Sequence, residues 1–244
     1  MSRRLIIGDI HGEYDRLEDV LKKADFNRFK DTLYSVGDLC DRGEQNVKVL
    51  SYLMSLKDFK MVRGNHDIWL YNYLYTESLN RIWIEYNGGY TTMNEIQSLG
   101  ESEGKNILDF LSKSRRAIYE DTFMISHGGI FSEENLMAEA RSELEGRDPN
   151  NDSEGNITWD RSYLTSAFIS QKMEEGKLND EQIYFYKDRL IPPIETDKWI
   201  FVGHTARSGP FINEKYHLIN MDTGSGKGGV LTLMDIDTKE YWQA

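Results

Sequence analysis

The chain has 244 residues, of which 39% are hydrophobic and 29% are charged, and its net charge at pH 7 is −12. These values are ordinary for a globular protein, no apolar run approaches the roughly 18 residues of a membrane helix, and the negative charge argues against nucleic-acid binding. The single cysteine, Cys40, excludes a disulfide within the chain, and the N-terminus is unlike a signal peptide, so we expect a cytoplasmic protein without a membrane partner.

The first third of the chain alternates strand-like and helix-like segments, which is the pattern of a parallel α/β sheet. Strand-like runs at residues 5–7, 33–36 and 59–62 each end in polar residues. The carboxyl ends of parallel strands meet at one edge of the sheet, where open α/β sheets bind their ligands. We therefore expect a binding site at that edge.

The remainder of the chain is mainly helical before it returns to strands. Helices are expected at about 68–113, a strand at 122–126, an acidic helix with a surface loop at 132–158, a further helical stretch at about 163–190, and strands at 199–202, 217–221, 230–236 and 240–242. The acidic segment is interpreted as a solvated surface, with the lining of a substrate entrance as the alternative. We expect one domain over residues 1–244, with helical insertions at about 68–113 and 132–190.

Five polar clusters follow predicted strands: Gly8–Gly12, Gly37–Gly43, Arg63–Asp67, Ser126–Gly129 and Gly203–Thr205. Four of the five histidines of the chain lie in these clusters. Oxygen and imidazole ligands without a thiolate suit Mn, Fe or Zn rather than a soft metal. The clusters predict two divalent metal ions, with Mn²⁺ preferred and Fe or Zn as alternatives.

The spacing of the clusters suggests how the ligands divide between the two ions. Asp9 and His11 are two residues apart, so their side chains point the same way and can bind one ion. A helix cap is the alternative role for Asp9. Asp38 has two oxygens and can bridge to a second ion, whose remaining ligands would be Asn65, His127 and His204. Two divalent ions carry more positive charge than their ligating carboxylates neutralise. The net positive charge of this metal centre would attract a phosphate and lower the pKa of a bridging water, so we expect hydrolysis by direct attack of a metal-bridging hydroxide.

A leaving alkoxide also needs a proton. His66, next to Asn65, is the candidate general acid, and Asp41 is the candidate partner of its ring, with a plain turn residue as the alternative for Asp41. A guanidinium fork matches phosphate oxygens, which makes three arginines candidate phosphate ligands: Arg42, Arg63 and Arg161. A structural ion pair is the alternative role for Arg63.

These clusters resemble the motifs of the calcineurin-like metallophosphoesterases: Gly-Asp-x-His-Gly, Gly-Asp-x-x-Asp-Arg-Gly, Arg-Gly-Asn-His with an acidic residue, a single-histidine segment, and Gly-His-Thr. Within that family the chain is most similar to the PPP-type protein phosphatases of the small bacterial and phage, lambda phosphatase-like group, which have stretches like Trp83–Gly89 and Trp159–Arg161. The resemblance covers nearly the whole chain. It implies the same ligands, acid pair and arginines, and two mixed β-sheets packed as a sandwich with helices outside.

The resemblance implies a serine/threonine protein phosphatase whose partner is a phosphorylated protein or peptide. The main alternative is hydrolysis of dinucleoside polyphosphates, because Asp67 replaces the Glu usual in protein phosphatases. We favour the phosphatase, since the motif clusters contain no lysine for additional phosphates. Lys227, in the glycine-rich turn after Asp222, is the one nearby candidate.

Two further interpretations remain open at this point. A non-catalytic binding scaffold is disfavoured, because the metal ligands and the acid are all present. The aromatic series from Trp69 to Trp83 is interpreted as packing on the core, with stacking on a nucleobase as the alternative.

Overall fold

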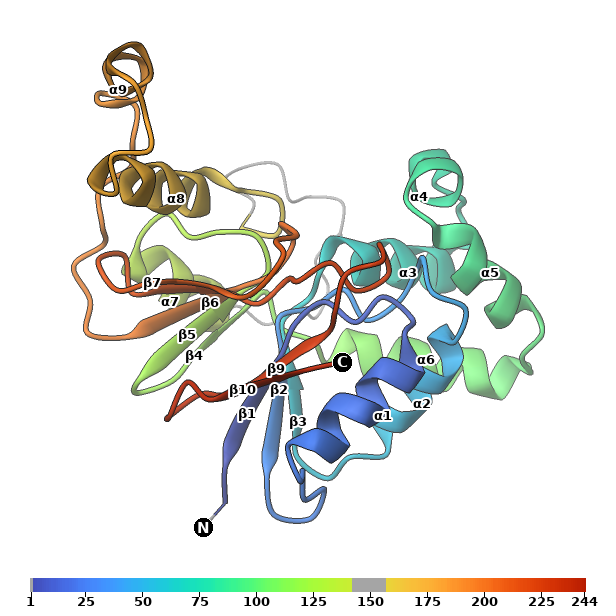
Figure 1. The fold of residues 1–244 in the computed structure, drawn as a ribbon. Coiled ribbons are helices and arrows are strands. Elements are labelled where there is room, and N and C mark those ends of the chain that lie inside the picture. The colour runs from blue at the N-terminus through green and yellow to red at the C-terminus, as the bar shows by residue number, and fades with distance from the viewer. Residues whose placement is uncertain (1, 142–156) are drawn as a thin grey trace.

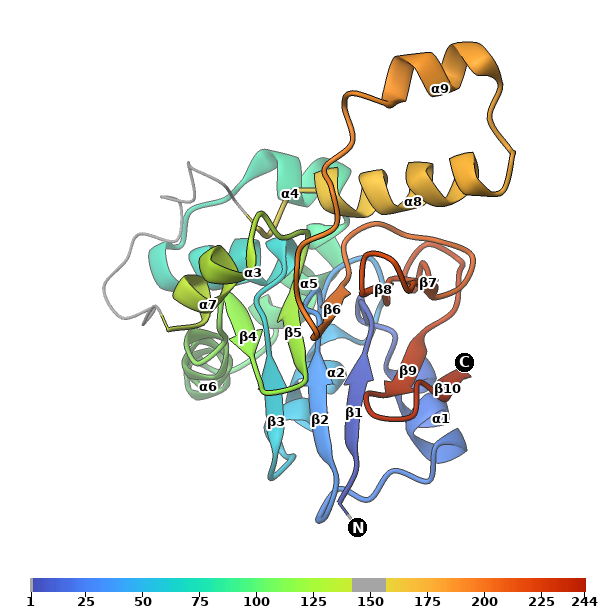
Figure 2. The same cartoon turned by 90° about the vertical axis from the view of Figure 1, so that its left-hand side faces the viewer.

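The computed structural model describes residues 2–141 and 157–244. Two five-stranded sheets pack against each other, and helices cover their outer faces (Figure 1, Figure 2). The first sheet has the order β10 (Tyr241–Gln243), β9 (Thr232–Asp235), β1 (Arg4–Ile7), β2 (Thr32–Ser35) and β3 (Phe59–Met61). The second has the order β4 (Ala117–Tyr119), β5 (Phe123–Ser126), β6 (Trp199–Val202), β8 (Leu218–Asn220) and β7 (Phe211–Asn213). The predicted α/β sandwich of two mixed sheets is confirmed.

Each sheet has a parallel centre and antiparallel edges. β1, β2 and β3 run parallel in the first sheet, and β5, β6 and β8 run parallel in the second. β9 and β10 form an antiparallel hairpin beside β1, while β4 and β7 are antiparallel edges of the second sheet. The sequence did not predict β4 and β7, two three-residue strands that lie between the predicted elements.

Alternation of side chains along the strands builds the core in layers. Ile6 and Phe201 belong to a buried cluster between the two sheets. Leu5 and Ile7, on the opposite face of β1, pack in a cluster with the helices of the first sheet. Ile200 packs on the outer face of the second sheet. Both faces of each sheet are therefore covered by apolar side chains.

Helices from the predicted helical segments cover these outer faces. On the first sheet lie α1 (Tyr14–Lys23), α2 (Asn46–Met54), α3 (Asn65–Thr76), α4 (Arg81–Tyr86), α5 (Gly89–Gln97) and α6 (Glu101–Ser112). The second sheet carries α7 (Glu133–Arg141) and α8 (Ser162–Glu174), and α9 (Asp180–Tyr186) extends beyond α8 in both views (Figure 1, Figure 2). The predicted surface loop after α7 lies mostly outside the described residues. None of the described helices is long and apolar enough to cross a membrane.

The topology brings six chain segments to the same region. β1, β2, β3, β5, β6 and β8 are each followed by a polar segment, and these begin at Gly8, Gly37, Arg63, His127, Gly203 and Asp222. Because the strands run parallel within each sheet, these segments meet at the carboxyl ends of both sheets.

Candidate metal centre

Asp38 lies at the centre of the predicted metal site. Its Oδ2 atom is 3.6 Å from Nε2 of His11, 3.4 Å from Nε2 of His127 and 3.9 Å from Nε2 of His66. Its Oδ1 atom accepts the backbone N–H of His66 at 3.0 Å. His11 follows a strand of the first sheet and His127 follows a strand of the second. Asp38 therefore stands where ligands from both sheets meet, the position that a carboxylate shared by two ions requires.

Two buried ligand atoms lack a protein partner within residues 2–141 and 157–244. They are Oδ1 of Asp9 and Nε2 of His204. The other oxygen of Asp9 accepts the backbone N–H of His204 at 3.0 Å, so the two residues lie together. A buried polar atom without a partner costs about 1–3 kcal/mol, which a bound cation would offset. The residues present thus fit the predicted metal ions.

The remaining predicted ligands lie in the same cluster. Ligand atoms of Asp38, His127 and His204 all lie within 4.8 Å of one another, and Oδ1 of Asn65 is 3.2 Å from Nε2 of His127. Helix α1 begins at Tyr14 without a side-chain cap, so Asp9 does not have the capping role that was its alternative. The structure brings all six predicted ligands together.

Unusual backbone conformations hold these side chains in place. The φ angles of His11, Asp38, Asp41, Arg42 and His204 are all positive, between 51° and 76°. Such values are uncommon outside glycine and concentrate at functional sites, where the surrounding structure imposes them.

Two neighbouring glycines make room for the buried carboxylates. A Cβ on Gly64 would lie 2.1 Å from Oδ1 of Asp38, and one on Gly203 would lie 2.3 Å from Oδ1 of Asp9. Larger residues at these two positions would push the carboxylates out of the site. The glycines of the third and fifth clusters therefore have a steric role.

Hydrogen bonds from the far side of the rings orient the ligand histidines. The Nδ1 atom of His11 donates to the carbonyl of Cys40 at 2.9 Å, and that of His127 donates to the carbonyl of Val36 at 2.6 Å. Each bond leaves Nε2 directed at Asp38. Such outer bonds fix the tautomer and orientation of metal-binding histidines.

Burial and neighbouring charges shift the pKa values of several predicted ligands. Burial, together with the carboxylates of Asp222 and Asp38, raises the pKa of Asp9 well above its usual range. Burial lowers the pKa of His204 to about 3, and the nearby His127 adds to this. Burial also acts to lower the pKa of His127, but the carboxylates of Asp38 and Asp9 outweigh it and raise that pKa to about 10. Bound cations would relieve the repulsion among these carboxylates.

His66 and Asp41 form a close pair beside the predicted ligands. The Nδ1 atom of His66 is 2.6 Å from Oδ2 of Asp41, and both side chains are buried. By distance alone His66 also groups with His11 and Asp38. The carboxylate of Asp41 orients the ring so that Nε2 faces the site beside Arg42, the arrangement that a general acid requires.

Two residues that the sequence did not assign to the site fix the carboxylate of Asp41. The indole N–H of Trp83 donates to Oδ2 of Asp41 at 2.6 Å, and the hydroxyl of Thr92 donates to Oδ1 at 2.6 Å. Trp83 lies in α4 and Thr92 in α5. The Trp83–Gly89 stretch was a signal for the first, whereas nothing in the sequence marks Thr92. Each carboxylate oxygen of Asp41 accepts a hydrogen bond from one of these donors. Asp41 is therefore held in place as the partner of His66 and is not only a turn residue.

Two further carboxylates lie within or beside the site. Asp67 accepts backbone N–H groups of Asp38 at 2.8 Å, Leu39 at 3.0 Å and Gly64 at 2.9 Å. It therefore ties the segment after β2 to the start of α3. Asp222 is buried and close enough to raise the pKa of Asp9. The sequence placed Asp222 at a strand end but gave it no role.

The three predicted phosphate-binding arginines occupy different places. Arg42 lies at the site, with Nη1 in contact with Nε2 of His11 and Nη2 at 2.9 Å from Nε2 of His66. Arg161 is exposed, donates to the carbonyl of Trp159 at 3.3 Å, and is close enough to lower the pKa of His204. Arg42 therefore contacts the site directly, and Arg161 is near enough to His204 to affect it electrostatically.

Arg63 does not match its predicted phosphate role. Its guanidinium is buried and donates to the hydroxyl of Ser114 at 2.8 Å and to the carbonyl of Leu111 at 3.1 Å. It also lies over the ring of Tyr71, 4.8 Å from the centroid. The backbone of Arg63 continues in the direction of β3. Side chains alternate between the two faces along an extended backbone, so the side chain of Arg63 points toward α6. Arg63 therefore joins the start of α3 to the segment after α6.

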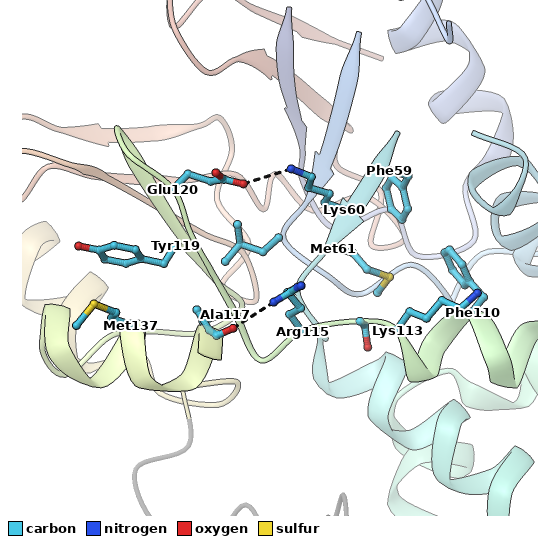
Figure 3. A pocket seen from close by; sticks show the side chains of 13 residues that line it. Phe59, Lys60, Met61, Phe110, Lys113, Arg115, Ala117, Tyr119, Glu120 and Met137 are labelled. Carbon is cyan, nitrogen blue, oxygen red and sulfur yellow. Dashed lines mark hydrogen bonds and ion pairs between the residues drawn. The ribbon is translucent and has the colours of Figure 1, made fainter. Parts of the chain in front are cut away.

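A separate cavity lies at the β3 and β4 edges of the two sheets (Figure 3). It has a volume of about 730 Å³ and includes Phe59, Lys60, Arg115 and Glu120 in its lining. Lys60 and Glu120 form an ion pair of 3.3 Å across it. None of the predicted site residues lines this cavity. The predicted chemistry is thus at the carboxyl ends of the strands rather than in this cavity.

The sequence profile described as calcineurin-like phosphoesterase matches residues 2–208. The chain belongs to this family. The match covers most of the chain and includes the segments that carry the six predicted ligands, from Asp9 to His204. Membership of the family and the geometry of the ligand atoms together support a metal-dependent phosphoesterase.

Curated relatives match the chain nearly from end to end. A protein of Vibrio cholerae named "Bis(5'-nucleosyl)-tetraphosphatase, symmetrical" is 27% identical over 97% of this chain and 96% of its own length. A protein of the same name from Neisseria meningitidis is 27% identical over 97% of this chain and 93% of its own length. A crystal structure provisionally described as a diadenosine tetraphosphatase superposes with a TM-score of 0.64, covering 100% of this chain and 93% of that one. At 23% identity, that last likeness supports the fold alone.

These relatives overturn the prediction of a serine/threonine protein phosphatase with a phosphoprotein partner. The motifs on which that prediction rested specify a phosphoryl centre, and they do not distinguish a phosphomonoester from the phosphates of a dinucleotide. The argument also counted Arg63 as a phosphate ligand, although its guanidinium is bound to Ser114 and Leu111. The preference for a phosphomonoester was therefore wrong.

Proposed function

We propose that this chain hydrolyses dinucleoside tetraphosphates symmetrically, giving two nucleoside diphosphates. The observation that supports this most is the end-to-end match to relatives of that name, which leaves no large part of the relatives without a counterpart. The chain also keeps a complete set of predicted ligands and a buried acid pair at one site. A non-catalytic scaffold would have no need of the His66–Asp41 pair.

The glycine-rich turn after β8 supplies the positive charge that additional phosphates need. A Cβ on Gly226 would lie 2.5 Å from Cβ of His11 and 3.2 Å from Cβ of Arg42, so this turn packs directly on the site. The next residue, Lys227, is exposed at its tip. Lys227 and Arg161 thus add charge outside the central Arg42, which suits a substrate with several phosphates.

The site residues suggest how the reaction proceeds. Asp9, His11, Asp38, Asn65, His127 and His204 would hold the metal ions, which supply a water of lowered pKa and positive charge for the phosphoryl oxygens. Arg42 would bind non-bridging oxygens of the phosphate under attack. The oxygen of a water molecule would bond to the phosphorus of the second phosphate, and the bond from that phosphorus to the oxygen bridging to the third phosphate would break. The departing nucleoside diphosphate would keep the bridging oxygen and the electron pair. His66 would donate the proton from Nε2, while Asp41 holds the ring at Nδ1.

Turnover of several phosphate esters by the metal-loaded enzyme tests this proposal. Rates with added Mn²⁺ are measured for diadenosine tetraphosphate, a phosphoserine peptide, p-nitrophenyl phosphate and bis-p-nitrophenyl phosphate, with the nucleotide products separated by chromatography. We expect diadenosine tetraphosphate to have the highest kcat/KM, by about tenfold or more, which corresponds to about 1.4 kcal/mol in transition-state binding. ADP should be the sole nucleotide product.

Two variants complete the experiment. Asp38→Asn protein prepared in parallel measures contaminating activity, because it lacks the shared carboxylate. Lys227→Ala should lower kcat/KM for diadenosine tetraphosphate more than for p-nitrophenyl phosphate, which has one phosphate only. AMP and ATP as products would contradict symmetrical cleavage, and a higher kcat/KM for the phosphopeptide would overturn the proposed substrate.

A further inference from the structure

An exposed indole stands beside the predicted metal site. The side chain of Trp159 is 38% exposed, and its ring lies 5.6 Å from the ring of His204 and 5.4 Å from that of Trp69. Trp69 in turn lies 4.9 Å from the ring of His66. The two indoles therefore form a continuous aromatic wall from the predicted acid to a predicted ligand.

The backbone around both indoles is fixed by a helix, by burial and by hydrogen bonds. Trp69 lies three residues after His66 on α3, so both side chains share one face of the helix. The backbone before Trp159 is buried at Ile157 and Thr158, and the carbonyl of Ile157 accepts the N–H groups of Gly128 and Gly129 at 2.8 Å each. After Trp159, the side chain of Asp160 accepts the N–H of Ser162 at the start of α8 at 2.9 Å. An exposed ring on such a fixed backbone is preorganised for contact with a ligand.

A cation lies directly beside the exposed indole. Arg161 is exposed, donates to the carbonyl of Trp159 at 3.3 Å, and influences His204 electrostatically. The segment Trp159–Arg161 therefore presents an aromatic face and a guanidinium together at the edge of the metal site. A nucleoside diphosphate has the matching chemistry, because its base can stack on an indole and its phosphates can bind an arginine.

We infer that Trp159, supported by Trp69, is the stacking platform for one nucleobase of the substrate. This inference rests on the proposed function, whose substrate has a nucleoside at each end. It revises the interpretation of Trp69 as a core residue only, since its ring also supports the exposed indole. Stacking is tolerant of base identity, so the platform selects for the presence of a nucleoside rather than for one base.

Competitive inhibition of p-nitrophenyl phosphate turnover by ADP and by pyrophosphate tests the platform. Both inhibitors carry two phosphates, and only ADP carries a nucleoside. We expect Trp159→Ala to weaken inhibition by ADP about 5- to 150-fold, the factor that matches the roughly 1–3 kcal/mol of one base stacked on an aromatic ring. Inhibition by pyrophosphate should stay within about twofold of wild type. Trp159→Phe should restore most of the ADP affinity.

The controls separate this inference from a structural role and from the proposed function. Tyr184→Ala removes a more exposed aromatic ring on α9 and should leave both inhibition constants unchanged. Equal weakening of ADP and pyrophosphate in Trp159→Ala would show a structural role and overturn the platform. Unchanged ADP inhibition in Trp159→Ala, in an enzyme that still cleaves diadenosine tetraphosphate, would overturn the platform alone. A wild-type enzyme that does not cleave diadenosine tetraphosphate but loses ADP affinity in Trp159→Ala would overturn the function alone.

Discussion

His66 combines two contacts that define its chemistry. Its Nδ1 atom lies 2.6 Å from Asp41, and its Nε2 atom faces the site 2.9 Å from Nη2 of Arg42. A ring held in this way can release a proton from Nε2 to a departing group. The need for that proton depends on the leaving group, because an alkoxide must be protonated whereas a phosphate anion is already a weak base at neutral pH.

We therefore predict that the effect of His66→Asn depends on the leaving group. Turnover of a phosphoserine peptide or another alkyl phosphate should fall by the roughly 10²- to 10⁴-fold typical of a lost general acid. Diadenosine tetraphosphate, whose proposed leaving group is ADP, and p-nitrophenyl phosphate should lose less. Steady-state rates together with metal content by elemental analysis provide the measurement. An equal loss for all substrates at full metal content would show that His66 does not protonate the leaving group.

The sequence predicted the individual site residues better than their supports. Each predicted ligand is a polar residue in the short segment that follows a strand, so the strand pattern and residue type were sufficient to find it. Thr92 is different, because it approaches Asp41 across 51 positions of sequence and lies within an ordinary helix. Thr92 was missed, whereas Arg63 was given a role that its contacts do not match. Its place in a motif suggested phosphate binding, but its side chain donates to Ser114.

At the scale of elements, α4 and α5 hold the acid pair. Trp83 from α4 and Thr92 from α5 donate to the two carboxylate oxygens of Asp41, and the backbone N–H of Asp41 lies 2.9 Å from the Thr92 hydroxyl. The carbonyl of Gly88, between these helices, accepts the N–H of Arg42 at 3.2 Å. These helices therefore position both the acid and the central arginine, in addition to covering the first sheet.

We predict that Thr92→Val slows catalysis without removing the metal ions. The nearly isosteric change removes the hydroxyl from Oδ1 of Asp41, and a hydrogen bond to a charged group contributes roughly 1.5–3 kcal/mol. Loss of even about 1.5 kcal/mol of transition-state stabilisation corresponds to about a tenfold fall in kcat. Thr76→Val, an exposed hydroxyl at the end of α3, is the matched control and should have normal rates. A normal kcat in Thr92→Val would mean that Trp83 alone is enough to position Asp41.

For the whole molecule, sequence patterns predicted most of the strands and helices, the resemblance to a known family implied the two mixed sheets, and the substrate was predicted wrongly. Runs of apolar residues predicted most strands, because burial on both faces of a sheet leaves a continuous apolar signal. The residues that we propose for recognition of the substrate lie outside the five polar clusters, and they include Trp159 and the turn that carries Lys227. Their importance lies in how close the fold brings them to the metal centre, which residue spacing alone does not determine.

The predicted ligands also join the two sheets into one structure. Asp9, His11 and Asp38 follow strands of the first sheet, whereas His127 and His204 follow strands of the second. Between them lie buried carboxylates, and burial together with repulsion from Asp222 and Asp38 raises the pKa of Asp9. Bound cations would remove that repulsion and bridge the sheets. Stability of the whole fold should therefore depend on the metal ions.

We predict that chelation lowers the melting temperature of the wild-type protein by about 5–10 °C. A ligand at 100 times its Kd stabilises the folded state by about 2.7 kcal/mol, and each kcal/mol shifts the melting temperature of a protein of this size by about 2–4 °C. Asp38→Asn should lose most of the metal-dependent shift because both ions would share its carboxylate, whereas His204→Ala should keep part of it. Asp237→Asn, a change in an exposed carboxylate far from the ligands, should retain the full shift. Calorimetric scans with Mn²⁺ and with a chelator provide the measurement, and a full metal-dependent shift in Asp38→Asn would rule out the shared role of that carboxylate.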